Sequence, residues 1–186
     1  MIIVTAPSGA GKTTIVRHLI NTFDNLSFSV SATTRSPRNG EVDGTDYYFL
    51  TLRKFKNRIK KDAFAEWEEV YPDKFYGTLK KEIEKKWRDK KNIIFDIEVK
   101  GATNLKKLYG DRALAIFIKP PSLDELIRRL ENRQTEDRRS LDERIARAKE
   151  ELTYEDKFDC VLVNDQLAVA IETAEKMVAD FLGISI

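Results

Sequence analysis

The residues best suited to chemistry lie near the start of the chain, in the segment Ala6-Pro-Ser-Gly-Ala-Gly-Lys-Thr-Thr14. An apolar run at residues 2–4 precedes it and apolar residues at helical spacing follow it, so the pattern predicts a strand, a Gly-rich turn and a helix. The backbone N–H groups of such a turn, together with the helix N-terminus, favour a polyphosphate. We expect Lys12 to contact the outer phosphates and the Thr13 hydroxyl to bind Mg²⁺.

This segment matches the phosphate-loop pattern G-x-x-x-x-G-K-[ST] except at the first glycine, where Ala6 stands. Alanine is tolerated at that position if its φ is negative, and is strained if φ is positive. The alternative is a turn with a helix cap that only resembles the pattern. The strand and helix predicted on either side favour the functional interpretation.

A second group with chemical potential is Arg35 and Arg38, followed by Tyr47 and Tyr76. Two guanidinium groups with tyrosine hydroxyls form a plausible clamp for a monophosphate, because their forked donors match its oxygens. The alternative is a pair of surface arginines on a Pro-containing loop, where ion pairs are weak.

A third group is the arginine-rich span 128–139, which continues to Arg144 and Arg147. It lies between two segments with capping-box spacing, Ser122 with Glu125 and Ser140 with Glu143. Such a span has the composition of a lid that brings cations over phosphates. Part of it is alternatively a solvated face, in which the arginines pair with neighbouring glutamates.

The elements that position these groups alternate between strands and helices. Continuous apolar runs at 93–97, 114–118 and 160–163 predict parallel strands buried on both faces. Helical segments are expected near 13–22, 102–108, 123–133, 140–153 and 166–182. The pattern predicts an α/β doubly wound sheet with right-handed crossovers.

The segment 31–80 interrupts that alternation and predicts a small, strand-rich subdomain. We expect short strands at 28–31 and 47–50, a helix capped by Thr51, a strand at 64–71 and a turn at 75–78.

Composition sets broad limits on the protein. The chain has 186 residues with 41% hydrophobic and 34% charged residues, as is typical of a soluble globular protein, and a net charge of +2. Cys160 excludes an internal disulfide, and His18 is the only histidine, which disfavours His-dependent catalysis. No signal peptide or membrane-length apolar run is evident, so we expect a cytoplasmic protein without a nucleic-acid or membrane partner. The sequence does not indicate the oligomeric state.

Several stretches, in order along nearly the whole chain, resemble the guanylate kinase family. The series Ser-x-Thr-Thr-Arg, Pro-Arg and Gly-Glu-Val is far more specific than the phosphate loop. The matching stretches are Ser8-Gly-Ala-Gly-Lys12, Phe28-Ser-Val-Ser-Ala-Thr-Thr-Arg35, Pro37-Arg38, Gly40-Glu-Val-Asp-Gly44, Asp46-Tyr-Tyr-Phe49, Phe64-Ala-Glu-Trp67, Tyr76-Gly-Thr78, Gly101-Ala102, Pro120-Pro-Ser122 and Val163-Asn-Asp165.

The resemblance implies an ATP-dependent kinase that phosphorylates GMP to GDP, and dGMP likewise to its diphosphate, with Mg²⁺. It implies a P-loop NTPase-type core at 1–30, 81–122 and 154–186, a GMP-binding subdomain at 31–80 and a helical lid at 123–153. The implied catalytic residues are Lys12, Arg38, Arg133 and Arg144. The implied ATP-binding residues are Ser8, Gly9, Ala10, Gly11, Lys12, Thr13, Thr14 and Asn164. The implied GMP-binding residues are Ser31, Arg35, Arg38, Glu41, Tyr47, Glu66, Tyr76, Thr78, Asp96 and Glu98.

Within this set Ser31, Glu66 and Thr78 are implied to recognise the base. The chemistry is reasonable by itself, because one carboxylate accepts both the ring N–H and the amino group of guanine. Adenine would place a lone pair against that carboxylate, and an unpaired buried polar group costs about 1–3 kcal/mol. The alternative for Glu66 is a surface carboxylate on an edge strand.

Asp96 ends a predicted strand, as the acidic residue of a Walker-B element does, and is expected to support Mg²⁺ through water or the acceptor phosphate. Three positions depart from the family pattern. Glu98 replaces a usual aspartate, Lys100 a usual glutamine, and Gln134 a usual glycine in the lid.

Two other functions are compatible with parts of the pattern. One is a noncatalytic guanylate-kinase-like module that binds proteins, but such modules tend to lose the glycine and lysine that Gly11 and Lys12 retain. The other is a kinase for a different nucleotide or a sugar phosphate, which would not require the side chains of Ser31, Glu66 and Thr78.

Overall fold

The computed structural model describes residues 1–132 and 138–185, and of residues 138–140 only the backbone. The chain forms two compact units. Unit 1 consists of Met1–Asp24 and Asp96–Ile186, and unit 2 of Asn25–Phe95. Unit 2 includes the whole of the strand-rich segment 31–80 together with elements on both sides of it.

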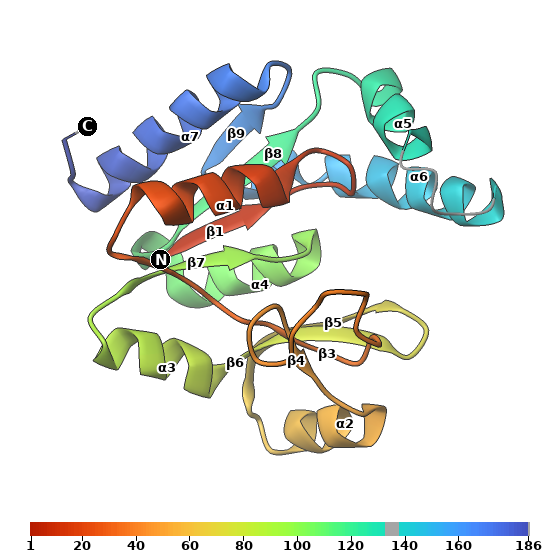
Figure 1. Ribbon diagram of the computed structural model, residues 1–186, viewed down its shortest axis with the longest axis vertical. Helices are drawn as coiled ribbons and strands as arrows, with labels where there is room; N and C mark the ends of the chain where they lie inside the picture. The colour runs from red at the N-terminus through yellow and green to blue at the C-terminus, as the bar shows by residue number, and fades with distance from the viewer. Residues whose placement is uncertain (133–137, 186) are drawn as a thin grey trace. The chain divides into compact units, whose positions relative to one another are not determined.

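The larger sheet has five strands in the order β2-β7-β1-β8-β9 (Figure 1). They are β1 (Ile2–Thr5), β2 (Leu26–Phe28), β7 (Asn92–Asp96), β8 (Leu114–Lys119) and β9 (Cys160–Val163). The pairs β2–β7, β1–β8 and β8–β9 are parallel. This arrangement confirms the expected α/β fold with a parallel sheet.

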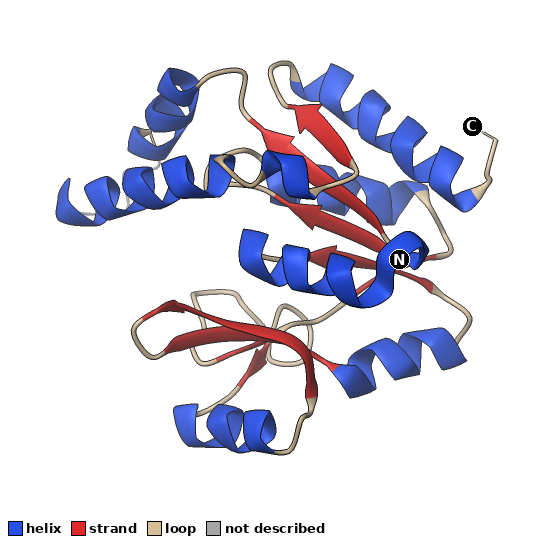
Figure 2. Cartoon of the chain, turned by 180° about the vertical axis from the view of Figure 1, so that it is seen from behind, coloured by secondary structure: helices blue, strands red, loops and turns tan. Residues whose placement is uncertain are grey.

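The helices of unit 1 cover both faces of its part of the sheet. They are α1 (Lys12–Thr22), α4 (Val99–Tyr109), α5 (Leu123–Glu131), α6 (Arg138–Leu152) and α7 (Leu167–Leu182), with 3₁₀ turns at Gly110–Arg112 and Glu155–Lys157. Figures 1 and 2 show α1 and α7 on one face and α4 on the other. All residues of β1 are buried, as a central strand covered on both faces requires.

β9 differs from the expectation of a strand buried on both faces. It lies at the edge of the sheet, and Val161 and Val163 are 39% and 47% exposed while Leu162 is buried. Cys160 is half-buried. Because side chains alternate along a strand, one face of β9 is covered and the other is open. The prediction that residues 160–163 are buried on both faces was therefore wrong. All four residues are apolar, so the sequence does not distinguish the exposed face from the covered one.

One of the two predicted helix starts is confirmed. The Ser122 hydroxyl accepts a hydrogen bond from the Glu125 backbone N–H at 3.1 Å and caps α5. Ser140 instead lies inside α6, which already includes Arg138, so the expected start at 140 was wrong. Arginine is a good helix former, and Arg138 and Arg139 therefore continue the helix toward the N-terminus.

Unit 2 contains a second, mixed sheet in the order β4-β3-β6-β5. Its elements are β3 (Ala32–Thr33), β4 (Tyr48–Phe49), α2 (Leu52–Lys60), β5 (Phe64–Tyr71), β6 (Lys74–Leu79) and α3 (Lys80–Arg88). The aromatic side chains of Phe55, Phe64 and Phe75 form its core, and the rings of Phe55 and Phe64 stack at 4.4 Å. Thr51 caps α2, as expected, through its hydroxyl and the Lys54 N–H.

Two predictions in this unit were wrong. Of the expected strand at 28–31, only Phe28 belongs to a strand, because β2 ends there and β3 of the other sheet begins at Ala32. The expected turn at 75–78 is part of β6, and the true turn contains Asp73, which has a φ of 58°.

Gly77 gave the misleading turn signal, and the structure shows why glycine stands there. A Cβ on Gly77 would lie 2.8 Å from the Glu66 carbonyl oxygen and 2.9 Å from Trp67 Cβ. The glycine therefore permits close approach of β6 to β5 and does not mark a turn.

We expect Gly77→Ala to lower the free energy of unfolding by about 1–3 kcal/mol, because the added methyl group overpacks the β5–β6 pair. Urea denaturation measures this loss. Gly77 has no left-handed φ, so the measured effect reports the clash and not backbone strain. A change within about 0.5 kcal/mol would show that the strands can separate to accept a methyl group.

Candidate functional site

The Gly-rich turn joins β1 to α1 as expected. Gly11 is the N-cap of α1 with a φ of 93°, and among the described non-glycine residues only Asp62, Asp73 and Lys90 have positive φ. Ala6 therefore satisfies the condition under which alanine replaces the first glycine of the pattern.

Asn164, which follows β9, fixes the backbone of this loop. Its Nδ2 atom donates to the Ala10 carbonyl oxygen at 2.8 Å, and the residue is 5% exposed. A Cβ on Gly11 would collide with the same Nδ2 atom. The resemblance implied that Asn164 binds ATP, and here its side chain contacts the loop that is expected to hold the phosphates.

The end of β7 meets the phosphate loop within unit 1. Lys12 Nζ lies 2.6 Å from Asp96 Oδ1 and donates to the Ile97 carbonyl oxygen at 3.1 Å. The Thr13 hydroxyl donates to Asp96 Oδ2 at 3.5 Å, at the long end of hydrogen-bond distances. The residues predicted to bind phosphate and Mg²⁺ are thus brought together.

These groups suit Mg²⁺ chemically, because a hydroxyl and a carboxylate are hard oxygen ligands and Mg²⁺ usually takes its remaining ligands from water and phosphates. Within residues 1–132 and 138–185, no group of three or more His, Cys, Asp or Glu side chains forms a metal site on protein ligands alone.

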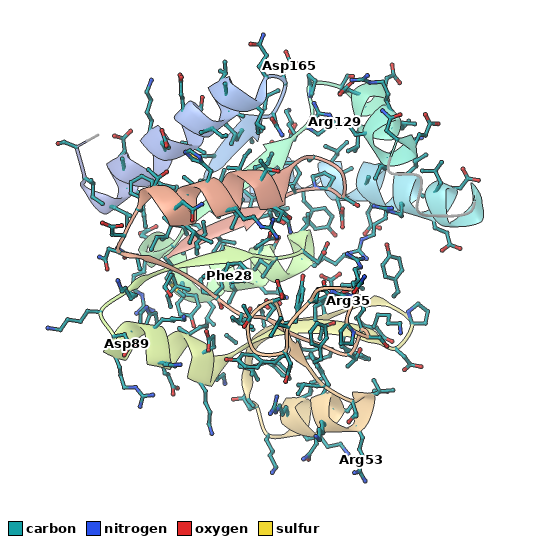
Figure 3. All side chains as sticks on the ribbon, viewed as in Figure 1. Phe28, Arg35, Arg53, Asp89, Arg129 and Asp165 are labelled. Atoms are coloured by element: carbon teal, nitrogen blue, oxygen red, sulfur yellow. The ribbon has the colours of Figure 1, made fainter. Side chains whose placement is uncertain are left out.

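The helices of the predicted lid also contact the loop. Arg144 Nη2 on α6 donates to the Ser8 hydroxyl at 2.8 Å. Arg129 on α5, labelled in Figure 3, donates to the Asn164 carbonyl oxygen at 3.1 Å. Arg133 and Gln134 lie outside the described residues.

Some arginines of this span pair with a neighbouring glutamate, as the alternative interpretation proposed. Arg128 and Arg129 donate to the Glu125 carboxylate at 2.7–2.9 Å. Hydrogen bonds from Arg128 and then Arg129 lower the pKa of Glu125 to about 2. Their partner, Glu125, lies one turn toward the N-terminus on the same helix.

A group that sequence reasoning missed lies between α6 and the segment after β7. Arg147 Nε lies 2.7 Å from Glu151 Oε1, and its Nη2 atom lies 3.4 Å from Glu98 Oε2. Burial, and then the neighbouring charge of Glu98, raise the pKa of Glu151. The spacing of Arg147 and Glu151, four residues apart in a helix, was the available signal for this pair.

In unit 2, Glu41 holds Arg35 in place. Both guanidinium Nη atoms of Arg35 donate to the two Glu41 carboxylate oxygens at 2.8 Å, and the Arg38 backbone N–H donates to the same carboxylate at 2.6 Å. The hydrogen bond to Arg35 lowers the pKa of Glu41 to about 2. Glu41 was expected among the GMP-binding residues, and here it binds the arginines of that group.

Aromatic rings surround the same arginine, which Figure 3 labels. The Arg35 guanidinium carbon lies 5.1 Å from the centroid of the Tyr47 ring and 5.7 Å from that of Phe49. The Tyr47 and Tyr76 rings meet edge to face at 6.1 Å. Arg35, Tyr47 and Tyr76 are therefore one cluster, while Arg38 has an exposed side chain beside it.

A second polar cluster in unit 2 is buried. Ser31 and Glu66 are each 7% exposed, and Thr78 is fully buried. Glu66 and Thr78 are directly opposite in the β5–β6 pair, and the Thr78 hydroxyl donates to Glu66 Oε1 at 2.7 Å. The alternative of a surface carboxylate is wrong, although β5 is indeed an edge strand.

Of the residues implied to bind the acceptor nucleotide, eight belong to unit 2 and Asp96 and Glu98 to unit 1. In unit 1, Asp96 contacts Lys12 and Glu98 contacts Arg147. None of the described helices has the length and apolar character to cross a membrane.

Comparison with known proteins gives a consistent result. A family model described as guanylate kinase matches residues 1–181. The chain is 48% identical over 184 residues to guanylate kinase of Porphyromonas gingivalis, covering 98% of each chain. It is 50% identical over 183 residues to guanylate kinase of Salinibacter ruber, covering 98% of this chain and 97% of that relative.

Solved structures agree with the sequence comparisons. The crystal structure of guanylate kinase from Anaplasma phagocytophilum superposes with a TM-score of 0.76 at 28% identity and covers 98% of this chain and 84% of that chain. Shikimate kinase from Bacteroides thetaiotaomicron has a TM-score of 0.52 at 15% identity and shares the fold alone.

The ion pair of Glu41 predicts a pH dependence of stability. Because its folded pKa of about 2 lies below the ordinary 4.5, the pair stabilises the fold above pH 4.5 and loses that contribution as the pH falls toward 2. We expect Glu41→Gln to reduce the free energy of unfolding at pH 6 by on the order of 1 kcal/mol, with a difference from wild type that shrinks across this window.

Urea denaturation of both proteins between pH 6 and about pH 3 measures this difference. Glu84→Gln is the matched control, since Glu84 is exposed on α3 of the same unit. If the free energy of unfolding of wild type exceeded that of Glu41→Gln by the same amount at every pH, the lowered pKa of Glu41 and its stabilising ion pair with Arg35 would be contradicted.

Proposed function

The chain belongs to the guanylate kinase family, and from this membership we propose how its residues carry out the family's reaction. It phosphorylates GMP to GDP with ATP as the phosphate donor. The observation that best supports GMP as the acceptor is the buried Glu66 carboxylate, which Thr78 already bonds at one oxygen. The remaining assignments below concern individual residues.

We propose that ATP binds at the loop between β1 and α1. The loop runs directly into the N-terminus of α1, where Gly11 is the N-cap, and the free N–H groups of a helix N-terminus favour phosphates. The hydrogen bond from Asn164 to Ala10 holds the loop in this shape. The proposed ATP-binding residues are Ser8, Gly9, Ala10, Gly11, Lys12, Thr13, Thr14 and Asn164.

Lys12 is proposed as the cation nearest the transferred phosphoryl group. Its contacts with Asp96 and the Ile97 carbonyl oxygen place the ammonium group beside the end of β7. Thr13 and Asp96 are the proposed Mg²⁺ ligands, Asp96 through water. Bound Mg²⁺ would neutralise charge on the β- and γ-phosphates of ATP.

The proposed clamp for the GMP phosphate consists of Arg35, Arg38, Tyr47 and Tyr76. Forked donors match phosphate oxygens, and Arg35 is already oriented by both oxygens of Glu41. Glu41 thus acts through the arginines that it bonds. Preorientation lowers the entropy that binding must otherwise overcome.

Ser31, Glu66 and Thr78 are proposed to recognise guanine. Glu66 accepts from the ring N–H and the amino group, while the Ser31 hydroxyl is available for the neighbouring carbonyl oxygen. The Thr78 hydroxyl already donates to Glu66 Oε1 and orients the carboxylate. Because the three residues are buried, an adenine that sets a ring lone pair against the Glu66 carboxylate, where guanine offers an N–H, meets a penalty of about 1–3 kcal/mol or more. dGMP carries the same base and is proposed as a second acceptor.

Transfer then needs no covalent intermediate on the protein. The acceptor oxygen and the leaving oxygen must lie in line, and cations must neutralise the charge on the transferred group. The proposed sources of this positive charge are Lys12, Arg133 and Arg144. On the acceptor side, the proposed residues are Arg38, Asp96 and Glu98. Arg144 is supported by its hydrogen bond to Ser8 in the loop.

The proposed domain roles follow from these residues. Residues 31–80 form the GMP-binding subdomain, 123–153 the lid, and 1–30, 81–122 and 154–186 the core that binds ATP. Excluding water from the reacting phosphoryl group prevents its hydrolysis. We propose the cytoplasm as the site of action, where both nucleotides are available.

We expect ADP release from ATP and Mg²⁺ in the presence of GMP, and none above background with AMP, UMP or CMP, because only guanine pairs both donors with Glu66. A coupled assay of ADP formation measures the four rates. Equal rates with AMP and GMP would refute the proposed base recognition.

Glu66→Gln is expected to raise KM for GMP by about tenfold or more, because the amide offers one acceptor and sets an N–H₂ group against the donors of guanine. KM for ATP is expected to change by less than about twofold, since Glu66 has no proposed contact with the donor. Glu69→Gln, an exposed change on the same strand, is the control. An unchanged KM for GMP in Glu66→Gln would remove Glu66 from the site.

A further inference from the structure

Three side chains of α6 form one stripe along the helix. Arg144, Arg147 and Glu151 are spaced three and four residues apart, which places them on the same face. Arg144 donates to Ser8 in the phosphate loop, and Arg147 contacts Glu98 after β7. Within unit 1, one helix therefore joins the donor-binding loop to a residue proposed for the acceptor.

Glu151 anchors Arg147. The glutamate is 6% exposed, its Oε1 atom accepts from Arg147 Nε at 2.7 Å, and among the described residues its Oε2 atom has no hydrogen-bond partner. A buried carboxylate with an unpaired oxygen is unfavourable unless a cation compensates it. Arg147 supplies that cation, so its guanidinium is held at one end by Glu151 while Nη2 stays directed toward Glu98.

Glu98 has no other fixed role in its own element. It is the N-cap residue of α4, yet its side chain makes no capping hydrogen bond; the Ala102 N–H bonds its backbone carbonyl oxygen instead. Its carboxylate oxygen Oε2 lies 3.4 Å from Arg147 Nη2. Glutamate has one more methylene than the aspartate usual at this position, and that added reach extends the carboxylate toward α6.

A neighbouring contact reinforces the connection only slightly. Lys100 Nζ lies 3.2 Å from Glu150 Oε1, but both side chains are more than half exposed, at 52% and 56%. Exposed pairs of this kind contribute between zero and about 1 kcal/mol. The half-buried Arg147, with side-chain exposure of 19%, is the stronger attachment.

We propose that Arg147 is a positioning residue for the acceptor nucleotide, holding the Glu98 carboxylate in the orientation that contacts GMP and coupling it to the helix that carries Arg144. This inference rests on the assignment of Glu98 to the GMP site in the proposed function. Without Arg147, the carboxylates of Glu98 and Glu151 lose the guanidinium group that contacts both of them. Their repulsion then turns Glu98, the more exposed of the two, toward solvent.

A double-mutant cycle between Arg147 and Glu98 tests the proposal. Arg147→Met keeps the apolar stem but removes both ion pairs. We expect it to raise KM for GMP about fivefold to tenfold, with kcat and KM for ATP changed by less than about twofold. Glu98→Gln is expected to raise KM for GMP at least as much, and adding Arg147→Met to Glu98→Gln is expected to have little further effect.

Lys149→Met is the matched control, because it removes one exposed cation from the same helix, and its KM for GMP should equal that of wild type. Arg147→Met removes the guanidinium group paired with the buried Glu151 carboxylate, so the cycle is repeated in a Glu151→Gln background, where no buried carboxylate loses its partner. Thermal unfolding of every variant shows that folded enzymes are being compared. Arg147→Lys, which keeps the charge without the fork, should recover part of the loss in KM.

The outcomes separate this inference from the assignment on which it rests. If Glu98→Gln leaves KM for GMP unchanged, Glu98 does not bind GMP, and both the assignment and the inference fall. If Glu98→Gln raises KM for GMP but the effects of the two substitutions multiply, or Arg147→Met changes kcat alone, only the positioning role of Arg147 is refuted.

Discussion

The ion pair between Lys12 and Asp96 is the interaction on which the site depends. It joins the turn after β1 to the residue that ends β7, two parts of the chain that are far apart in sequence. Parallel strands bring their carboxyl ends to the same edge of a sheet, and phosphate-binding turns form at that edge. The ammonium and the carboxylate compensate each other's charge at low exposure. Phosphates bound at the proposed ATP site would meet a cation that is already in place.

Glutamates orient arginines repeatedly in this protein. Glu41 holds Arg35, Glu151 holds Arg147, and Glu125 holds Arg128 and Arg129. An arginine side chain has many rotamers, and fixing it before a phosphate arrives removes an entropic penalty from binding. The three cases differ in energetic weight. The Glu125–Arg128 pair has an exposed guanidinium and stabilises the fold little, whereas the Glu151 carboxylate is buried and depends more on its arginine partner.

The sequence predicted the features that depend on local pattern. Apolar runs identified β1, β7 and β8, and the hydroxyls of Thr51 and Ser122 marked the starts of α2 and α5. Features set by tertiary neighbours could not be obtained this way. Gly77 resembled a turn residue because nothing nearby in sequence reveals that β5 occupies the space beside it. The exposed face of β9 could not be predicted because its residues are as apolar as those of a buried strand.

The hydrogen bond from Asn164 to Ala10 spans 154 positions, almost the length of the chain. The phosphate loop is among the first residues that the ribosome synthesises. The Asn164 side-chain amide that supports its backbone is made only after β9. A nascent chain therefore carries an unfinished nucleotide site through nearly all of its translation. The hydrogen bond that supports the proposed ATP-binding loop can therefore form only after the last strand has been made.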